Sequence, residues 1–231
     1  MKIIFSTLSL LLAVLLVSCS GNTSNADMEG EVTSVSKPAK KVDAAIRGGI
    51  GIGDVAPDFE LKGTDGKMHS LATVKDANGE TPKGYIVTFT CNTCPYAVGY
   101  ESRLAKLHDD MSAKGYPVVA IQPNDTDLKP EDGMEGMIQR KKEQNFNFAY
   151  LLDEGQQVYP RYGASKTPEL YVLDADKVVR YHGAIDDSPQ DPDAVKVKYV
   201  ENAIEALEKG EDPSPATVKA IGCSIKTKKS K

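Results

Sequence analysis

Two cysteines stand at the junction of an apolar strand and an amphipathic helix, and this junction limits the folds open to the chain. The residues before the pair, Ile86–Thr90, are β-branched and aromatic, the composition of a central strand. Cys91 and Cys94 follow at once, and residues 96–114 are predicted to form a helix. Its apolar residues recur on one face: Tyr100, Leu104, Leu107 and Met111. A strand that leads directly into such a helix predicts an α/β fold.

Strands and helices continue to alternate along the rest of the chain. Apolar runs predict further strands at residues 118–121, 146–152, 170–173 and 178–181, the last two as a hairpin. Helical spacing predicts helices at residues 134–144, 156–162 and 194–208. One face of the last helix would carry Val197, Val200, Ala203, Ile204 and Leu207. With a turn at residues 64–67 between two short strands, the expected fold is a central mixed sheet with helices on both faces and an N-terminal hairpin.

The spacing of the two cysteines indicates redox chemistry. A helix N-terminus carries a partial positive charge, which is expected to favour the Cys91 thiolate. That thiolate attacks a partner's disulfide, and Cys94 then attacks the mixed disulfide and releases the partner. Half of a zinc site is the structural alternative, but the other candidate ligands are scattered along the sequence: His69, His108, His182 and Cys223. The pair therefore predicts thiol–disulfide exchange without a metal or a cofactor.

The N-terminal residues have the order of an export signal. Lys2 is followed by the apolar run 3–17, which is too short to cross a bilayer core about 30 Å thick. The sequence Leu16-Val17-Ser18-Cys19 resembles the lipobox of bacterial lipoproteins. That resemblance implies cleavage before Cys19, a lipid on Cys19, and a membrane-anchored protein in the periplasm or on the cell surface. An ordinary signal peptide with a chance cysteine is the alternative.

Composition suggests where the domain begins and ends. Residues 1–18 would be the signal peptide, and the polar residues 19–47 a flexible tether. Residues 48–210 would fold, and residues 211–231 would form a C-terminal tail with a solvated basic end from Lys226. The net charge of −5 argues against nucleic-acid binding. Disulfides persist outside the cytoplasm, so the expected partners are protein thiols or disulfides and an upstream thiol–disulfide donor.

From about Ile52 to Leu207 the sequence resembles the thioredoxin superfamily, in its redoxin branch of AhpC/TSA-like and TlpA/ResA-like proteins. The opening Gly53–Leu61 is similar to the first motif of that branch, and Thr167-Pro168 is similar to the cis-proline of the superfamily. The resemblance implies a thioredoxin-like oxidoreductase. It also implies that the cis-proline faces the two cysteines, where its backbone pairs with a bound partner, so that Thr167 and Pro168 join Cys91 and Cys94 in the catalytic site.

The sequence departs from thioredoxin around the cysteine pair, where Asn92-Thr93 replaces the usual Gly-Pro. Thr90 replaces the usual tryptophan, and Tyr85 stands where a buried acid accepts the proton of the resolving thiol. Residues 181–187 and 222–226 resemble a redoxin subgroup with a C-x-x-C-P site. The second of these motifs contains Cys223, for which two interpretations stay open. It is either a buried free cysteine or a third redox thiol that reaches back to the site.

Three other functions stay open. A peroxiredoxin would reduce hydroperoxides at Cys91, and its motif has a threonine at the position of Thr88 but a proline where this chain has Gly84. A copper chaperone would need a histidine near the cysteine pair, for which His182 is the candidate. A non-catalytic lipoprotein that retains the fold is the third. The presence of Cys94 beside Cys91 favours exchange over peroxide reduction.

Overall fold

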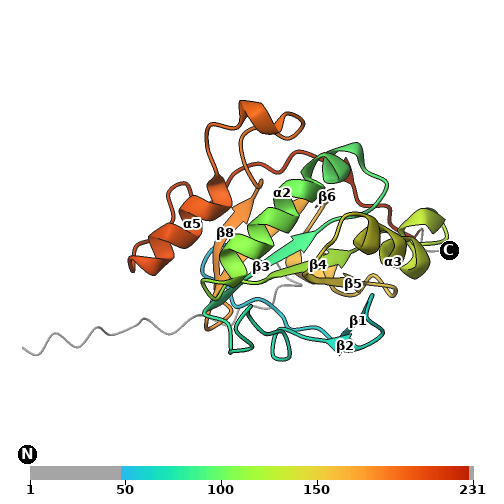
Figure 1. Cartoon of the computed structure of the whole chain (residues 1–231), viewed down its shortest axis with the longest axis horizontal. Helices are drawn as coiled ribbons and strands as arrows, with labels where there is room; N and C mark the ends of the chain where they lie inside the picture. The colour runs from blue at the N-terminus through green and yellow to red at the C-terminus, as the bar shows by residue number, and fades with distance from the viewer. Residues whose placement is uncertain (1–47, 229–231) are drawn as a thin grey trace, which may run out of the picture. The chain divides into compact units, whose positions relative to one another are not determined.

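The computed structural model describes residues 48–228, in which one main sheet is packed against helices (Figure 1). The strands are β1 (Leu61–Gly63), β2 (Met68–His69), β3 (Gly84–Phe89), β4 (Val118–Gln122), β5 (Ala149–Leu152), β6 (Lys166–Thr167), β7 (Glu169–Asp174), β8 (Val179–Gly183) and β9 (Cys223–Ser224). The helices are α2 (Pro95–Ser112), α3 (Met134–Glu143), α4 (Tyr159–Tyr162) and α5 (Tyr199–Glu208), with 3-10 turns η1 (Pro130–Asp132) and η2 (Pro192–Ala194). The main sheet has the order β2-β1-β5-β4-β3-β7-β8, in which β3, β4 and β5 are parallel and the other pairs antiparallel. The predicted α/β fold with a mixed sheet is confirmed.

The centre of the sheet is apolar on both faces because its strands alternate between two layers of core. In β3, Ile86 packs in the layer that contains the α2 side chains, whereas Val87 and Phe89 pack in the opposite layer. The same alternation runs along Val118–Ile121 of β4. Strands buried on both faces are continuous apolar runs, which explains why the sequence predicted them well.

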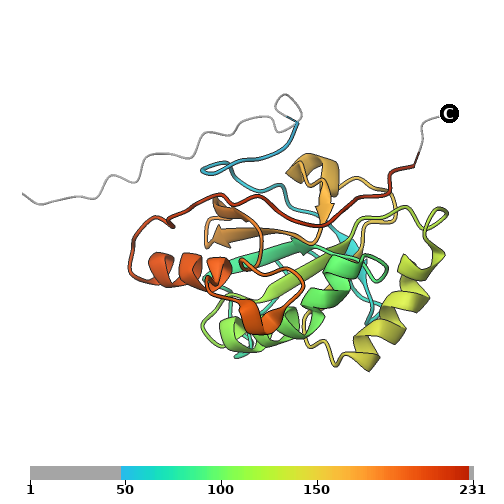
Figure 2. The ribbon, with the colours of Figure 1, turned by 90° about the horizontal axis from the view of Figure 1, so that it is seen from above.

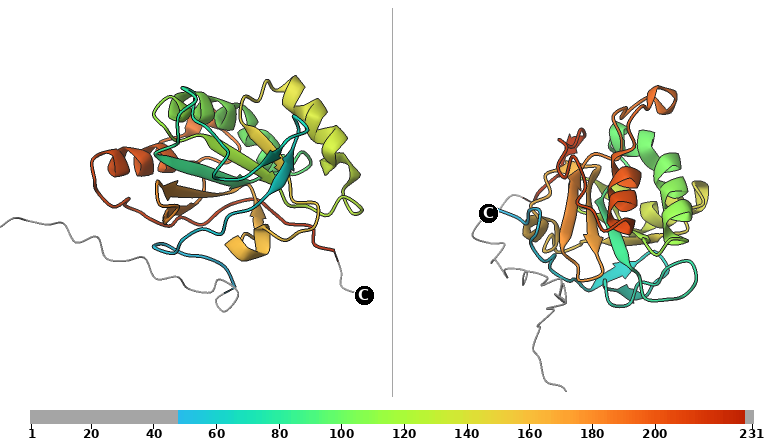
Figure 3. Two further views of the ribbon diagram at one scale, coloured as in Figure 1. Left: turned by 90° about the horizontal axis from the view of Figure 1, so that it is seen from below. Right: turned by 90° about the vertical axis from the view of Figure 1, so that its left-hand side faces the viewer.

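The two faces of the sheet are covered differently (Figures 2 and 3). Helices α2, α3 and α5 cover one face, where the predicted stripe of α2 is buried: Tyr100, Leu104, Leu107 and Met111. The other face is covered by the short helix α4 and by the segment before β1, through Ile50, Ala56 and Phe59. The N-terminal hairpin β1–β2 joins the main sheet by pairing with β5. Helices therefore lie on both faces, as expected, but the longer ones share a single face.

The last helix begins later than predicted. The prediction of a helix from residue 194 is wrong for its first five residues, since α5 starts at Tyr199. Asp187 Oδ1 accepts the N–H groups of Lys196 and Val197 at 2.9 and 3.0 Å, and these bonds hold the preceding stretch as a loop. Val197 is accordingly outside the helix and 36% exposed. The other predicted positions on this face are buried or partly buried: Val200, Ala203, Ile204 and Leu207.

The C-terminal segment, residues 211–228, runs back across the domain (Figure 2). The backbone N–H and C=O of His182 in β8 both hydrogen-bond to the backbone of Ala216–Val218, at 3.0 Å. Strand β9 then pairs with β6 in a separate two-stranded sheet. The carbonyl of Lys226 accepts the N–H of Asp125 at 2.8 Å. The prediction of a solvated chain from Lys226 onward is therefore wrong at this residue.

The predictions for the signal peptide, for Cys19 and for the tether up to residue 47 lie outside the described residues, as do residues 229–231. Within residues 48–228, none of the helices combines the length and the apolar composition that crossing a membrane requires.

Candidate functional site

The two cysteines meet the end of β6 at the junction of β3 and α2. The Thr167–Pro168 peptide bond is cis, as the resemblance to thioredoxins predicted. Cys91 Sγ lies 3.2 Å from Thr167 Oγ1, and the thiol of Cys94 donates to the Thr167 carbonyl at 3.1 Å. Both cysteines are free thiols and each is 3% exposed. The structure thus brings together the residues that the sequence analysis placed in the catalytic site.

Backbone N–H groups at the N-terminus of the helix act on both cysteines. Helix α2 begins at Pro95 with Cys94 as its N-cap, and the N–H of Cys94 lowers the pKa of Cys91 as expected, although larger effects act against it. The Cys91 side chain, helped by the thiol and the N–H of Cys223 and by the N–H of Ala97, lowers the pKa of Cys94 to about 4. Contact with Cys94, burial and the charge of Asp132 raise the pKa of Cys91. The two thiols titrate as one pair, in which the first proton is lost easily and the second is shared between the two sulfurs.

A buried carboxylate fixes the two residues between the cysteines. Asp132 of η1 is 0% exposed, and its Oδ1 accepts the N–H of Asn92 at 2.8 Å. Its Oδ2 accepts the hydroxyl of Thr93 at 2.9 Å and the amide of Asn124 at 2.7 Å. The hydroxyl of Tyr150 in β5 donates to Asn92 Oδ1 at 2.9 Å. The loop between the cysteines is therefore held from η1 and from β5, and the carboxylate has the donors that burial demands.

Sequence reasoning missed Asp132. Tyr85, at the position where thioredoxins carry a buried acid, lies in the apolar layer that α4 covers. Asp132 supplies the carboxylate near the pair instead, from a turn that is distant in sequence. Its only signal is the run Pro130–Gly133, which is typical of a turn but does not reveal what the turn faces.

A second buried acid supports the strand before the cis-proline. Glu169 Oε2 accepts the N–H groups of Ser165 and Lys166 at 2.8 and 2.9 Å, and its Oε1 lies 2.7 Å from His182 Nε2. Burial alone would raise the pKa of Glu169, but the hydrogen bonds from His182 and from the two N–H groups lower it below its ordinary value. His182 also stacks on the ring of Tyr171, with centroids 4.3 Å apart. The residue considered as a copper ligand therefore supports β6.

No metal site is formed by the part of the chain that the structure describes: none of its groups of three or more His, Cys, Asp or Glu could hold an ion. Cys91, Cys94 and Cys223 line a cavity of about 210 Å³, together with Lys129 and Lys226.

The hydroxyl that faces Cys91 comes from Thr167. Thr88, which the peroxiredoxin motif would supply, is buried, and its hydroxyl makes no hydrogen bond within residues 48–228. The threonine at the position of the peroxiredoxin motif therefore makes no hydrogen bond with Cys91.

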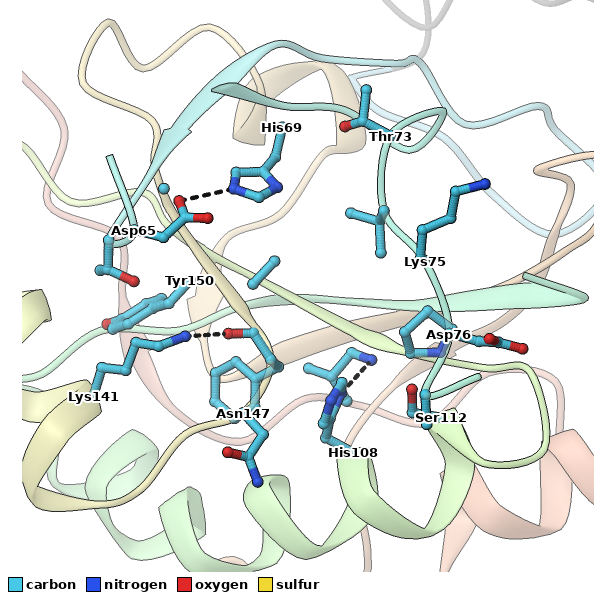
Figure 4. A pocket seen from close by; sticks show the side chains of 18 residues that line it. Asp65, His69, Thr73, Lys75, Asp76, His108, Ser112, Lys141, Asn147 and Tyr150 are labelled. Carbon is cyan, nitrogen blue, oxygen red and sulfur yellow. Dashed lines mark hydrogen bonds and ion pairs between the residues drawn. The ribbon is translucent and has the colours of Figure 1, made fainter. Parts of the chain in front are cut away.

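Another cavity, of about 390 Å³, lies between the β1–β2 hairpin, α2 and β5 (Figure 4). Its polar side chains already serve the fold. His69 Nε2 lies 2.9 Å from Asp65 Oδ1, and Lys141 Nζ donates to the carbonyl of Phe148 at 2.8 Å. No cysteine lines this cavity, and Tyr150, whose hydroxyl donates to Asn92, is the residue that it shares with the redox site.

Two solved structures match most of the chain. An uncharacterized conserved protein from Geobacillus kaustophilus is 36% identical, with a TM-score of 0.71, over 78% of this chain and 94% of that protein. A hypothetical protein from Sinorhizobium meliloti is 34% identical, with a TM-score of 0.71, over 78% of this chain and 96% of that protein.

A more distant likeness concerns the fold alone. A domain of a possible thiol-disulfide isomerase from Cytophaga hutchinsonii is 20% identical, with a TM-score of 0.50, over 70% of this chain and 96% of that domain. No curated protein matches the chain.

The family comparison covers more than half of the sequence. The model of the AhpC/TSA family matches residues 52–182, which include Cys91, Cys94, Thr167 and Pro168. With the mixed sheet and the cis-proline beside the cysteines, this match identifies the chain as a member of the AhpC/TSA family with a thioredoxin-like fold.

Proposed function

We propose that this protein is an extracytoplasmic thiol–disulfide oxidoreductase that exchanges disulfides with partner proteins through Cys91 and Cys94. Membership of the AhpC/TSA family supports a redox role. The more specific proposal rests on one observation. Cys91 and Cys94 are free thiols at the start of a helix, and the sulfurs of both contact Thr167.

The reduced pair has what exchange requires, a thiolate and a thiol in contact. Cys91 first passes its proton to the Cys94 thiolate and then attacks the partner's disulfide as a thiolate, and one partner sulfur leaves as a thiolate. Cys94 then loses this proton to solvent and attacks the Cys91 sulfur. The Cys91–Cys94 disulfide forms, the bond from Cys91 to the partner breaks, and the second partner sulfur leaves as a thiolate. The partner is reduced and the pair oxidised.

The lowered pKa of Cys94 supports this order of steps. A resolving thiol with an ordinary pKa would need a base to remove its proton, which is the task of the acid that Tyr85 replaces. Once Cys91 is in the mixed disulfide it no longer donates to Cys94, but the thiol and the N–H of Cys223 and the N–H of Ala97 still lower the pKa of Cys94. The second attack therefore does not depend on that acid.

Insulin reduction by dithiothreitol tests the proposal. The parent would be the full chain with Cys19→Ser, which lacks only a cysteine outside the described residues and is the matched control. We expect Cys91→Ser to abolish the acceleration of insulin reduction. We expect Cys94→Ser to accumulate mixed disulfides with insulin, visible as added mass on non-reducing gels. Full activity of the Cys91→Ser chain would contradict the mechanism.

A further inference from the structure

The C-terminal segment brings a third cysteine to the pair. Strand β9 lies antiparallel to β6, with Cys223 opposite Thr167. The N–H of Cys223 donates to Cys94 Sγ at 3.4 Å. Cys223 also packs against the small buried cluster of Cys91, Cys94 and Ala97. The three cysteines of the described residues therefore form one group.

Hydrogen bonds beyond Cys223 hold the segment in this place. The N–H of Ile225 donates to the carbonyl of Ser165 at 3.1 Å, and the Ile225 side chain is buried in the core layer that α4 covers. The N–H of Lys226 donates to Asn124 Oδ1 at 2.8 Å. These contacts of Ile225 and Lys226, which follow Cys223 in the sequence, hold Cys223 in a fixed position beside Cys94.

Two glycines allow the segment to approach the sheet. A Cβ on Gly222 would overlap the carbonyl oxygen of Thr167, and a Cβ on Gly183 would overlap the carbonyl oxygen of Val218. Gly183 also has a φ of +145°, a backbone conformation that residues other than glycine rarely adopt. Gly183 and Gly222 belong to the two motifs at residues 181–187 and 222–226. Both motifs therefore contribute to the docking of the C-terminal segment.

The docked strand occupies the edge of β6 beside the cysteines. A partner that presented an extended peptide to the pair would need backbone hydrogen bonds at this edge. While β9 is in place, those bonds are already made within the chain. A partner strand therefore requires β9 to leave.

We propose that Cys223 is a third redox residue, which forms a disulfide with Cys94 and so locks β9 over the site. This inference rests on the proposed exchange at Cys91 and Cys94. When the Cys91–Cys94 disulfide is present, the Cys223 sulfur attacks Cys94 Sγ. The Cys94–Cys223 bond forms, the Cys91–Cys94 bond breaks, and Cys91 leaves as a thiolate that takes up the proton lost by Cys223. The chain neither gains nor loses electrons in this step.

The geometry suits Cys94 as the sulfur that both neighbours share. Because the N–Cα bond is about 1.5 Å long, the 3.4 Å contact places Cys223 Cα within about 5 Å of Cys94 Sγ. Rotation about χ1 of Cys223 then moves its sulfur toward Cys94 without a change in the backbone. Cys223 is half-buried whereas the other two cysteines are buried, so a reducing thiol from solvent reaches the locked disulfide at Cys223.

Mapping of disulfides in single variants tests this inference. The full chain with Cys19→Ser would be treated with oxidised glutathione, blocked with N-ethylmaleimide and digested with trypsin. Cleavage gives residues 84–103, with Cys91 and Cys94, and residues 220–226, with Cys223. In the Cys91→Ser variant we expect these two peptides to be joined and both free thiols to be lost. In the matched Cys223→Ser variant we expect a disulfide within residues 84–103.

Each outcome decides between the two proposals. If Cys91→Ser keeps both thiols under conditions that close the pair in Cys223→Ser, the role of Cys223 is overturned and the exchange proposal stands. If the pair also stays open in Cys223→Ser, the exchange proposal fails as well. Should circular dichroism show that a variant is unfolded, the parent chain decides. Joined peptides in partly oxidised parent support the third redox residue, and their absence overturns it.

Discussion

At the scale of single residues, the site depends on two buried carboxylates, one at the loop between the cysteines and one at the strand before the cis-proline. Asp132 binds the loop between the cysteines, and Glu169 binds the backbone before the cis-proline. Each has a set of hydrogen-bond donors, which offsets the cost of burying its charge.

We predict that Asp132→Asn makes Cys91 more reactive at lower pH. The charge of Asp132 is one of the causes that raise the pKa of Cys91, so its removal lowers that pKa. The midpoint of the pH dependence of Cys91 alkylation, followed by mass spectrometry, should move to lower pH. Loss of the charged acceptor should also reduce the free energy of unfolding by about 1–3 kcal/mol.

The matched control for this variant is Glu131→Gln. Glu131 is adjacent and exposed, and it contributes only its backbone carbonyl to Asn92. The Glu131→Gln variant should leave the midpoint of the pH dependence of Cys91 alkylation unchanged. An unchanged midpoint in Asp132→Asn would show that the carboxylate does not act on Cys91.

A second prediction concerns acid stability. The folded-state pKa of Glu169 lies below the ordinary value of 4.5, so its stabilising effect is complete above that pH and is lost as the pH falls through the folded pKa. Glu169→Gln should lower the free energy of unfolding at pH 7 by about 1–3 kcal/mol. The difference from the parent should shrink below pH 4, as urea titrations at several pH values would show. A difference that stays constant between pH 7 and pH 3 would contradict this role.

Residue types and their spacing predicted part of the site but not its buried carboxylates. Cys91, Cys94, Thr167 and Pro168 were predicted because their types and spacing, or their resemblance to thioredoxins, point to one chemistry, and the structure brings them together. Asp132 was missed because its contacts span 39 or 40 residues of sequence, and no periodicity connects it to the cysteines.

At the scale of elements, periodicity predicted the central strands and the helices α2 and α5, because apolar residues recur at regular intervals on the face that each element buries. The ends of elements did not. Strand β5 begins at Ala149 rather than at residue 146, since Phe146 and Phe148 stack on each other with ring centroids 4.6 Å apart. Strand β9 has two residues and no pattern of its own, so only the structure places it on β6.

We predict that Gly222→Ala detaches β9 from β6. The added Cβ would overlap the carbonyl oxygen of Thr167, and backbone must move to relieve the overlap. The free energy of unfolding should fall by about 1–3 kcal/mol. Alkylation of Cys91 and Cys94 should become faster, because the segment that covers them is displaced.

The control for this variant is Gly99→Ala in α2. The nearest atom to its added Cβ is the carbonyl oxygen of Pro189 at 3.5 Å, an ordinary contact. Alanine is the better helix former, so this variant should be more stable by about 0.5–1 kcal/mol and leave cysteine alkylation unchanged. Equal stability of the Gly222→Ala chain and its parent would contradict the tight docking of β9.

At the scale of the whole molecule, the fold and the family are those of an AhpC/TSA protein, and the N-terminal sequence adds the expectation of export and lipid anchoring. We propose that the mature chain begins at Cys19 and is held at a bacterial membrane outside the cytoplasm. The apolar run 3–17 and the lipobox-like Leu16–Cys19 support this proposal.

The anchoring predicts a lipid on Cys19. Cells that express the chain and are fed alkynyl palmitate should label the wild type and the matched Cys223→Ser control, and both should sediment with membranes. Cys19→Ser should lose the label and leave the membrane fraction. Labelling that persists in Cys19→Ser would contradict the lipobox interpretation.

A redox titration in glutathione buffers shows whether Cys91 and Cys94 exchange disulfides. The chain with Cys19→Ser and Cys223→Ser would be equilibrated, blocked with N-ethylmaleimide and weighed by mass spectrometry. We predict one reversible two-electron transition in which Cys91 and Cys94 lose their thiols together. A pair that never closes, while added peroxide oxidises Cys91 alone, would contradict it and favour a peroxidase.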